Sequence, residues 1–220
     1  MPVKELWDES SQWELIKLWE KSWQAQGWET CILQEHHARE HPRFYFFNEM
    51  FRSKVSAFGE EFNTACFMRW FAAYVVGSTE NKPLMLCDYD VCNYYFPPRE
   101  PKSGKMEIIC DGPKIFLGTV LGTPQHFLDM AELFAAHVLD EHDWSLIYNQ
   151  VHTDDLRLVE RMFDGTKEKP EWLVRSPGCA LFPAPGWKTA PMTHYAYAMR
   201  AAGFWPKYKF IPDLRPVSYA

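Results

Sequence analysis

The chain of 220 residues (25.9 kDa) fits a single domain over residues 1–220, large enough to bury an extensive core. Hydrophobic residues make up 47 % and charged residues 24 %, which excludes a disordered or fibrous chain, and the net charge of −6 disfavours nucleic acid as a partner. Aromatic residues are frequent at 16 %, and such rings either fill a core or stack on sugars and bases.

Four elements are expected in the first 40 residues. In chain order these are a short strand over 3–7, a helix that Ser11 caps and Gly27 ends, a strand over 28–33, and a helix over 35–40. The proline that follows at position 42 stops the last of them.

The middle of the sequence predicts a buried helix followed by a buried strand. Residues 63–76 are apolar on nearly every helical face, and Gly77 is expected to end the helix. Leu84, Met85, Leu86 and Cys87 then form a short apolar run that is typical of a buried strand.

Two more elements are expected before an irregular end. Residues 114–119 predict a strand and residues 124–139 an amphipathic helix, with a strand-to-helix loop over 118–123 that lines the acceptor side of the site. The segment from Glu171 onward is rich in Pro and Gly and is expected to be mostly irregular. Helices that alternate with buried strands indicate an α/β domain.

The cysteines and the lack of an apolar span indicate the compartment. No stretch reaches the about 18 apolar residues that cross a bilayer, and the N-terminus does not have the layout of a secretory signal. The six cysteines show no Cys-x-x-Cys spacing, so we expect free thiols and a cytoplasmic protein. Their even number leaves disulfides as the alternative.

The sharpest local signal is the pair Asp88 and Asp90 at the exit of the apolar strand 84–87. Two such close carboxylates repel unless a cation or a proton offsets their charge, and oxygen ligands suit Mg²⁺ or Mn²⁺. Ligands of open α/β sheets sit beyond the carboxyl ends of strands, where this pair falls. The structural alternative is that Asp88 caps a turn and Asp90 is solvated.

Arg69 lies in the middle of the apolar helix 63–76. A guanidinium there needs a partner, because an unpaired buried charge is costly. The helix leads through a short loop into the strand before Asp88, so Arg69 is expected near the same site. It either pairs with an acid or grips a phosphate.

These segments together resemble the glycosyltransferases with a DXD sugar-binding region, which include the initiating α-1,6-mannosyltransferase and capsule transferases. The resemblance rests on four segments over residues 1–96: the opening Met1-Pro2-Val3-Lys4-Glu5-Leu6-Trp7, the helix end at Trp23 before Trp28-Glu29, the Arg-centred helix Cys66 to Gly77, and Cys87-Asp88-Tyr89-Asp90-Val91. Ser78 replaces the second glycine of the usual pair, the loop 79–83 is longer than in the family, and the opening histidine is absent.

The resemblance implies a single GT-A-like nucleotide-binding α/β/α sandwich that moves a sugar from a nucleotide-sugar donor (a UDP- or GDP-sugar) to a glycan or other hydroxyl acceptor. It implies that Asp88 and Asp90 hold Mn²⁺ or Mg²⁺ on the donor diphosphate. The donor contacts that it implies are Leu6, Trp7, Arg69, Asp88 and Tyr89.

The resemblance implies two later residues of the site, a late histidine at the metal and an acid near the acceptor. His194 is expected to join the metal, because neutral imidazole is a good ligand for Mn²⁺, although a loop histidine is also often merely exposed. Asp143 is the candidate catalytic base toward an acceptor hydroxyl, with a solvated acidic helix end as the alternative. His36, His37 and His41 do not have the spacing of a zinc site.

Two other function classes stay open. One is a non-catalytic nucleotide-sugar-binding module, against which the intact acidic pair argues. The other is a metal-dependent hydrolase or phosphotransferase, which needs further carboxylates, and the only adjacent pair left to supply them is Asp154 and Asp155. Most of the aromatic excess is expected on buried helix faces, while Trp7, Tyr89, Trp144, Trp187 and Tyr195 are candidates for stacking on a ligand.

Overall fold

The computed structural model describes residues 9–52, 60–111, 115–139, 155–181, 186 and 188–195. Its helices are α1 (Glu9–Gln24), α2 (Glu35–Arg39), α3 (Phe44–Arg52), α4 (Glu60–Glu80), α5 (Pro124–Leu139) and α7 (Asp155–Phe163), with a short 3-10 helix η2 (Lys102–Gly104). Its strands are β1 (Leu84–Cys87), β2 (Val91–Asn93), β3 (Met106–Ile109), β4 (Thr119–Gly122), β5 (Leu173–Ser176), β6 (Cys179–Leu181) and β7 (Met192–His194).

The strands form two small sheets. In the first, with order β1-β4-β3-β5, β4 runs antiparallel to β1 and β3, and β5 is parallel to β3. In the second, with order β2-β7-β6, β2 is antiparallel and β6 parallel to β7. The expected mixture of helices and buried strands is therefore confirmed.

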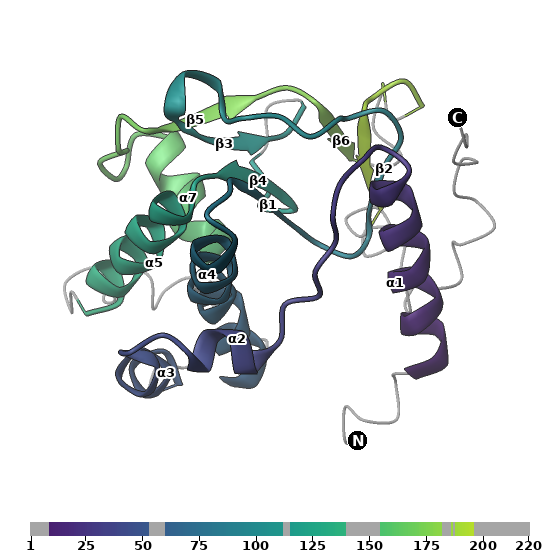
Figure 1. Cartoon of the computed structure of the whole chain (residues 1–220). Coiled ribbons are helices and arrows are strands. Elements are labelled where there is room, and N and C mark those ends of the chain that lie inside the picture. The colour runs from purple at the N-terminus through teal and green to yellow at the C-terminus, as the bar shows by residue number, and fades with distance from the viewer. Residues whose placement is uncertain are drawn as a thin grey trace, which may run out of the picture.

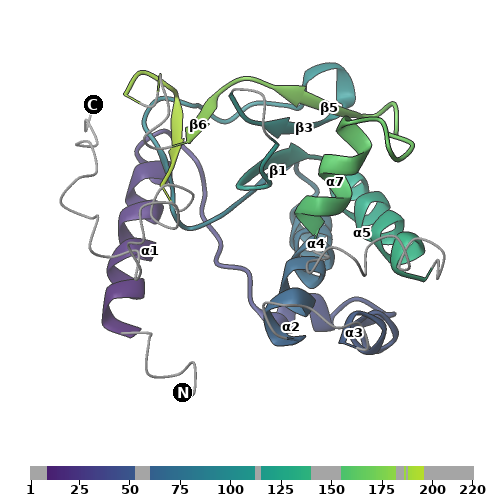
Figure 2. The same cartoon turned by 180° about the vertical axis from the view of Figure 1, so that it is seen from behind.

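The helices divide between two regions of the molecule. Helices α4 and α5 pack together below the four-stranded sheet, and α2 and α3 lie at the end of α4 away from it (Figure 1). The view from behind places α7 beside α4 and α5 (Figure 2). Helix α1 lies apart from these and packs beside β2. The chain passes from the first sheet to the second directly after β1, where the acidic pair lies.

Aromatic rings fill the core between the helices. The Phe51 and Phe67 rings stack at 4.5 Å, the Phe47 and Phe71 rings at 4.4 Å, and Trp70 meets Phe134 edge-on at 5.3 Å. All of these side chains are buried. This confirms that helix faces absorb much of the aromatic excess.

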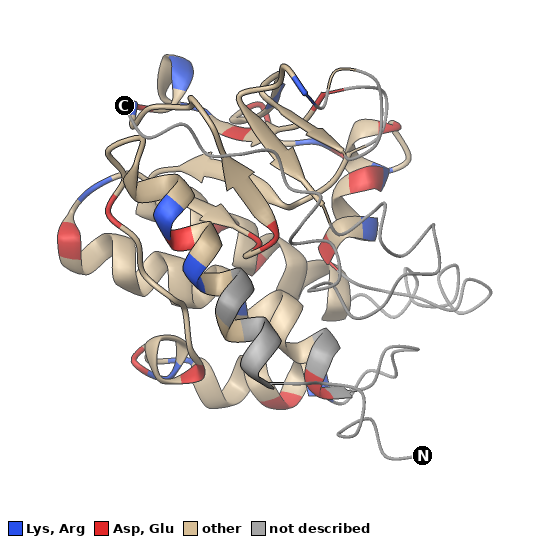
Figure 3. Ribbon diagram, turned by 90° about the vertical axis from the view of Figure 1, so that its right-hand side faces the viewer, with Lys and Arg blue, Asp and Glu red and all other residues tan. Residues whose placement is uncertain are grey.

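Charged residues of both signs are interspersed in Figure 3, where no helix or strand is uniformly basic.

One buried carboxylate lies inside the four-stranded sheet. Glu107 on β3 accepts two hydrogen bonds from the Arg99 guanidinium (2.6 and 2.8 Å), one from the Lys102 backbone N–H (2.6 Å) and one from the Ser176 hydroxyl (2.5 Å). Burial alone would raise its pKa, but these donors outweigh burial and lower the pKa to about 2. We call this set the Glu107 network.

Several predicted elements are confirmed. The helix expected from Ser11 corresponds to α1, the helix over 35–40 to α2, the strand over 84–87 to β1 and the helix over 124–139 to α5. The expected cap is wrong, because α1 begins at Glu9 and Ser11 lies inside the helix. The apolar helix over 63–76 is part of α4. The expected strand over 3–7 lies outside the described residues.

The prediction that Gly77 ends its helix is wrong, because α4 continues to Glu80. A Cβ at position 77 would lie 2.5 Å from Leu84 Cδ2 and 3.0 Å from Pro124 Cγ. The glycine therefore permits the close approach of α4 to β1 and α5, which is a different use from capping.

The expected strand over 28–33 is also wrong, since these residues form no strand and pair with none of the described strands. Side chains anchor the segment instead: Trp28 Nε1 donates to the Phe96 carbonyl at 2.8 Å, and Thr30 Oγ1 donates to Glu20 Oε1 at 3.2 Å. Apolar β-type composition therefore did not suffice to make residues 28–33 a strand.

The strand expected over 114–119 is displaced, because pairing begins only at Thr119 and runs to Gly122. Those residues were expected in a loop lining the acceptor side, and that expectation is wrong: they are buried in the sheet. A Cβ on Gly122 would lie 3.1 Å from Met106 Cε, so its glycine serves close packing. The C-terminal segment that was expected to be mostly irregular contains the short strands β5, β6 and β7, and residues 196–220 of it lie outside the described residues.

Candidate metal centre

The acidic pair lies in the tight turn that joins β1 to β2. Asp88 follows β1 directly, its backbone N–H donates to the Gly118 carbonyl on the approach to β4 (3.0 Å), and its own carbonyl accepts from the Val91 N–H (3.0 Å). The turn therefore carries the chain from one sheet to the other. It places the side chains of Asp88 and Asp90 at the junction of the two sheets.

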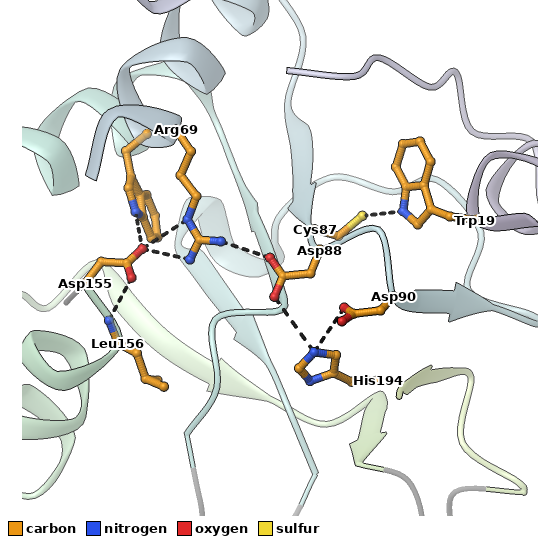
Figure 4. Close-up of polar contacts among 9 residues, drawn as sticks. Trp19, Arg69, Cys87, Asp88, Asp90, Asp155, Leu156 and His194 are labelled. Atoms are coloured by element: carbon orange, nitrogen blue, oxygen red, sulfur yellow. Dashed lines mark hydrogen bonds and ion pairs between the residues drawn. The ribbon is translucent and has the colours of Figure 1, made fainter. Parts of the chain in front are cut away.

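The pairing of β2 with β7 brings His194 to this turn. Val91 and His194 are opposite one another in the antiparallel ladder, and the next N–H, of Tyr195, donates to the Asp90 carbonyl at 3.0 Å. His194 Nε2 lies 3.2 Å from Asp90 Oδ1 and 3.8 Å from Asp88 Oδ2. Figure 4 shows the imidazole directed between the two carboxylates.

Asp88, Asp90 and His194 can share one cation. One ligand atom from each lies within 4.8 Å of the other two, and this is the one such group of three found among the described residues. Ligand atoms at right angles on a Mg²⁺- or Mn²⁺-sized ion lie about 3 Å apart, which fits the carboxylate–imidazole distance. The donor set of two carboxylates and an imidazole suits a divalent transition metal such as Mn²⁺.

The two carboxylates differ in exposure. The Asp90 side chain is 0 % exposed and the Asp88 side chain 36 %, while His194 is 10 % exposed. A ligand from solvent therefore reaches the group from the side of Asp88. With three protein ligands, a six-coordinate ion keeps positions for water or phosphate oxygens.

Contacts with Phe116 and Gly118 fix the position of the His194 imidazole. The Phe116 ring stacks on His194 with centroids 5.2 Å apart and an angle of 23°. A Cβ at Gly118 would lie 3.4 Å from two atoms of the imidazole, so the backbone of Gly118 also packs against it. The histidine thus belongs to a packed sheet, and the alternative of a merely exposed loop histidine is wrong.

Arg69 reaches the site from α4, as the sequence predicted. Its Nη1 donates to Asp88 Oδ1 at 2.9 Å, while Nε and Nη2 donate to Asp155 Oδ2 at 3.0 and 2.7 Å. Trp70 Nε1 donates to the same Asp155 oxygen at 2.8 Å. We call Arg69, Trp70, Asp88 and Asp155 the Asp155 network, and Figure 4 shows Arg69 between Asp155 and Asp88.

The ionisation of Arg69 is secured by this network. Burial alone would lower its pKa, but the charges of Asp155 and Asp88 outweigh burial and raise the pKa. Of the two roles expected for Arg69, pairing with acids is the one found. Asp155 itself was noticed only as half of an acidic pair, because nothing local in the sequence links it to a helix 86 residues earlier.

Three tryptophans hold the N-terminal segment along the exit of β1. Trp19 Nε1 donates to Cys87 Sγ at 3.1 Å, and Trp23 Nε1 donates to the Val91 carbonyl at 2.9 Å. Together with the Trp28–Phe96 hydrogen bond, they hold residues 19–28 alongside residues 87–96. Burial raises the pKa of the Cys87 thiol well above its usual range, so beside Asp88 it stays protonated.

The remaining predicted residues divide into three groups. Tyr89 is half-buried and packs against the core beside the acidic pair. Tyr195 is fully buried with its hydroxyl 2.7 Å from that of Tyr94, so the expectation that its ring stacks on a ligand is wrong. The others lie outside the described residues: Leu6, Trp7, Asp143, Trp144, Asp154 and Trp187.

Within the described part of the chain, His36, His37 and His41 form no such centre. His41 is buried against the Phe71 ring at 4.8 Å, and His37 Nδ1 accepts from the Gln34 N–H at 3.0 Å. All six cysteines are in the described residues and carry free thiols.

No protein-family model, no curated protein and no solved structure matches this chain. Among the described helices, none is long and apolar enough to cross a membrane.

Proposed function

We propose that this protein is a metal-dependent glycosyltransferase that uses a nucleotide-sugar donor. The observation that carries the proposal is the convergence of Asp88, Asp90 and His194 at the end of β1, with ligand atoms within 4.8 Å. The resemblance of residues 66–77 and 87–91 to the DXD transferases adds the expectation of a GT-A-like fold.

The donor set favours Mn²⁺ over Mg²⁺, because Mg²⁺ prefers oxygen ligands alone whereas imidazole suits transition metals. Such an ion, when bound, stabilises the charge on a departing nucleoside diphosphate. Asp90 and His194 would hold the ion from inside the fold, and the more exposed Asp88 would border the donor. Tyr89 adjoins that border, and Leu6, Trp7 and Asp143 keep the donor and acceptor roles that the resemblance implies.

The network around Arg69 argues against a hydrolase or phosphotransferase that uses several carboxylates on the metal. Asp155 is the additional acid that approaches the site, but Arg69 and Trp70 donate to its Oδ2, and the Leu156 N–H donates to its Oδ1. These donors hold the Asp155 carboxylate toward Arg69 and Trp70, which argues against its use as a further metal ligand.

The test is thermal unfolding of the full chain with a panel of UDP- and GDP-sugars, with and without Mn²⁺. A ligand at 100 times its Kd adds about 2.7 kcal/mol, which for a chain of this size raises Tm by about 5–11 °C. We expect this shift for at least one nucleotide sugar and only with Mn²⁺. No shift with any of them would overturn the proposal.

Two variants locate the effect and distinguish binding from transfer. Asp90→Asn should abolish the Mn²⁺-dependent part of the shift, whereas Glu107→Gln, a matched change in a buried carboxylate elsewhere, should keep it. Release of nucleoside diphosphate from the shifting donor is then measured with and without candidate acceptors. A shift without turnover for any acceptor would favour the non-catalytic binding module.

A further inference from the structure

Asp155 is the first residue of α7, and its side chain is only 3 % exposed. Described residues donate three hydrogen bonds to its Oδ2, from Arg69 Nε, Arg69 Nη2 and Trp70 Nε1, and one to its Oδ1, from the Leu156 N–H. These donors fix the carboxylate in one orientation. Asp155 therefore acts on the site only through the residues that bind it.

Arg69 transmits this orientation to Asp88. The guanidinium is planar, so two N–H groups bound to Asp155 determine the direction of the third nitrogen. That nitrogen, Nη1, binds Asp88 Oδ1 at 2.9 Å. The other oxygen of the same carboxylate, Oδ2, is then the one that faces His194, at 3.8 Å.

The charges of the group match a divalent ion. Asp88, Asp90 and Asp155 carry three negative charges and Arg69 one positive charge. With a neutral imidazole the group has a net charge of −2. Without Asp155, Arg69 would cancel the charge of Asp88, and only one negative charge would remain to attract the ion.

We infer that Asp155 is a positioning residue for the metal centre, and that it acts through Arg69 to hold Asp88 with one oxygen toward the cation. The inference rests on the metal centre of the proposed function. It assigns a role to a residue that does not touch the metal or the donor.

The experiment is a calorimetric titration of the full chain with Mn²⁺ alone, without any nucleotide. Arg69 is the outer partner of Asp88, and loss of such a partner costs about 10–100-fold in affinity; because Asp155 acts one step further out, we expect about a tenfold loss for Asp155→Asn. Glu107→Gln is the matched control, because it neutralises another buried carboxylate paired with an arginine. It should lower Tm while leaving the Mn²⁺ affinity within about twofold of the wild type.

A double-mutant cycle tests whether the effect passes through Arg69. In an Arg69→Gln background, Asp155→Asn should change the Mn²⁺ affinity by less than about threefold, because the connection to Asp88 is already lost. Arg69→Lys keeps the charge but lacks the planar fork, and we expect about a tenfold loss. If Asp155→Asn does not fold, the Mn²⁺ affinity of Arg69→Lys tests the inference in its place.

Wild-type Mn²⁺ affinity in folded Asp155→Asn or in Arg69→Lys would overturn the inference, as would full additivity in the cycle. These results are independent of the donor. If the chain binds Mn²⁺ but no nucleotide sugar, the proposed function fails and the inference stands. If the wild-type chain does not bind Mn²⁺, both fail.

Discussion

The Glu107 and Asp155 networks contain the same kinds of side chain but differ in how the charges are balanced. In each, an arginine fork binds a buried carboxylate that also accepts from a neighbouring side chain, Ser176 in one case and Trp70 in the other. In the Glu107 network one guanidinium meets one carboxylate, and the charges cancel. In the Asp155 network the guanidinium meets two carboxylates, and the second borders another acid and a histidine.

This difference separates a structural ion pair from a binding site. Buried ion pairs contribute little net stability on their own, but removing one partner is costly. A closed pair such as Arg99 and Glu107 therefore serves the fold alone. At the end of β1, by contrast, the described residues bring Arg69 together with Asp88, Asp90 and Asp155, and a bound cation would balance the remaining negative charge.

The largest effect is expected from breaking the Glu107 network. Glu107→Ala removes a fully buried carboxylate and leaves Arg99, the Lys102 N–H and Ser176 without their acceptor. We expect the free energy of unfolding to fall by about 3–5 kcal/mol, measured by urea denaturation. The Mn²⁺ affinity of the folded fraction should not change, and a change would show that the two networks are coupled.

Low pH should weaken the Glu107 network without a mutation, because it protonates Glu107. The pKa of Glu107 is about 2 in the fold against 4.5 ordinarily, so its ionised form stabilises the fold above about pH 4.5 and this contribution is lost as the pH falls toward 2. The free energy of unfolding should drop by about 3 kcal/mol more in the wild type than in Glu107→Gln between pH 6 and pH 2. Parallel pH profiles of the two proteins would contradict the role of Glu107.

A matched pair of smaller changes compares the networks directly. Ser176→Ala and Trp70→Phe each remove one donor from a buried carboxylate and leave the arginine in place. Each should lower the free energy of unfolding by about 1.5–3 kcal/mol, since each lost hydrogen bond is to a charged group. Only Trp70→Phe should also weaken Mn²⁺ binding, and equal Mn²⁺ affinities in the two variants would remove the distinction between the networks.

The smallest effect concerns the choice of ion. His194→Gln replaces the imidazole with an amide, whose oxygen is a harder ligand. Calorimetry should show about a tenfold loss of Mn²⁺ affinity and less than about a threefold change for Mg²⁺. An equal loss for both ions would mean that His194 supports the fold of the site and is not a ligand.

Local pattern and composition predicted the elements that carry the site. The apolar helix with Arg69 at its centre and the buried strand before Asp88 both stand where the sequence indicated, because burial on all faces requires no knowledge of the neighbours. The meeting of Arg69 with Asp88 followed from their short connection along the chain. His194 was expected at the metal from the resemblance, and the structure brings it there through a strand that was not expected.

The wrong predictions share one cause: the observed structure there depends on contacts with residues that are distant in the sequence. Residues 28–33 are held by side-chain hydrogen bonds to Phe96 and Glu20, and the strand from Thr119 gained its place by pairing with β1 and β3. The short strands β5, β6 and β7 lie in a segment whose Pro and Gly indicated loops. Gly77 was expected to be a helix end because its real constraint, contact with Leu84 and Pro124, is not local.

The sequence by itself determined the residue types of a cation site and the two elements that deliver most of it, since spacing along one helix or strand fixes which side chains are neighbours. The tertiary structure alone decided which acid would hold Arg69. Asp155 is joined to the site by hydrogen bonds across 86 residues, and the free energy of such a contact depends on burial and geometry that only the assembled fold provides.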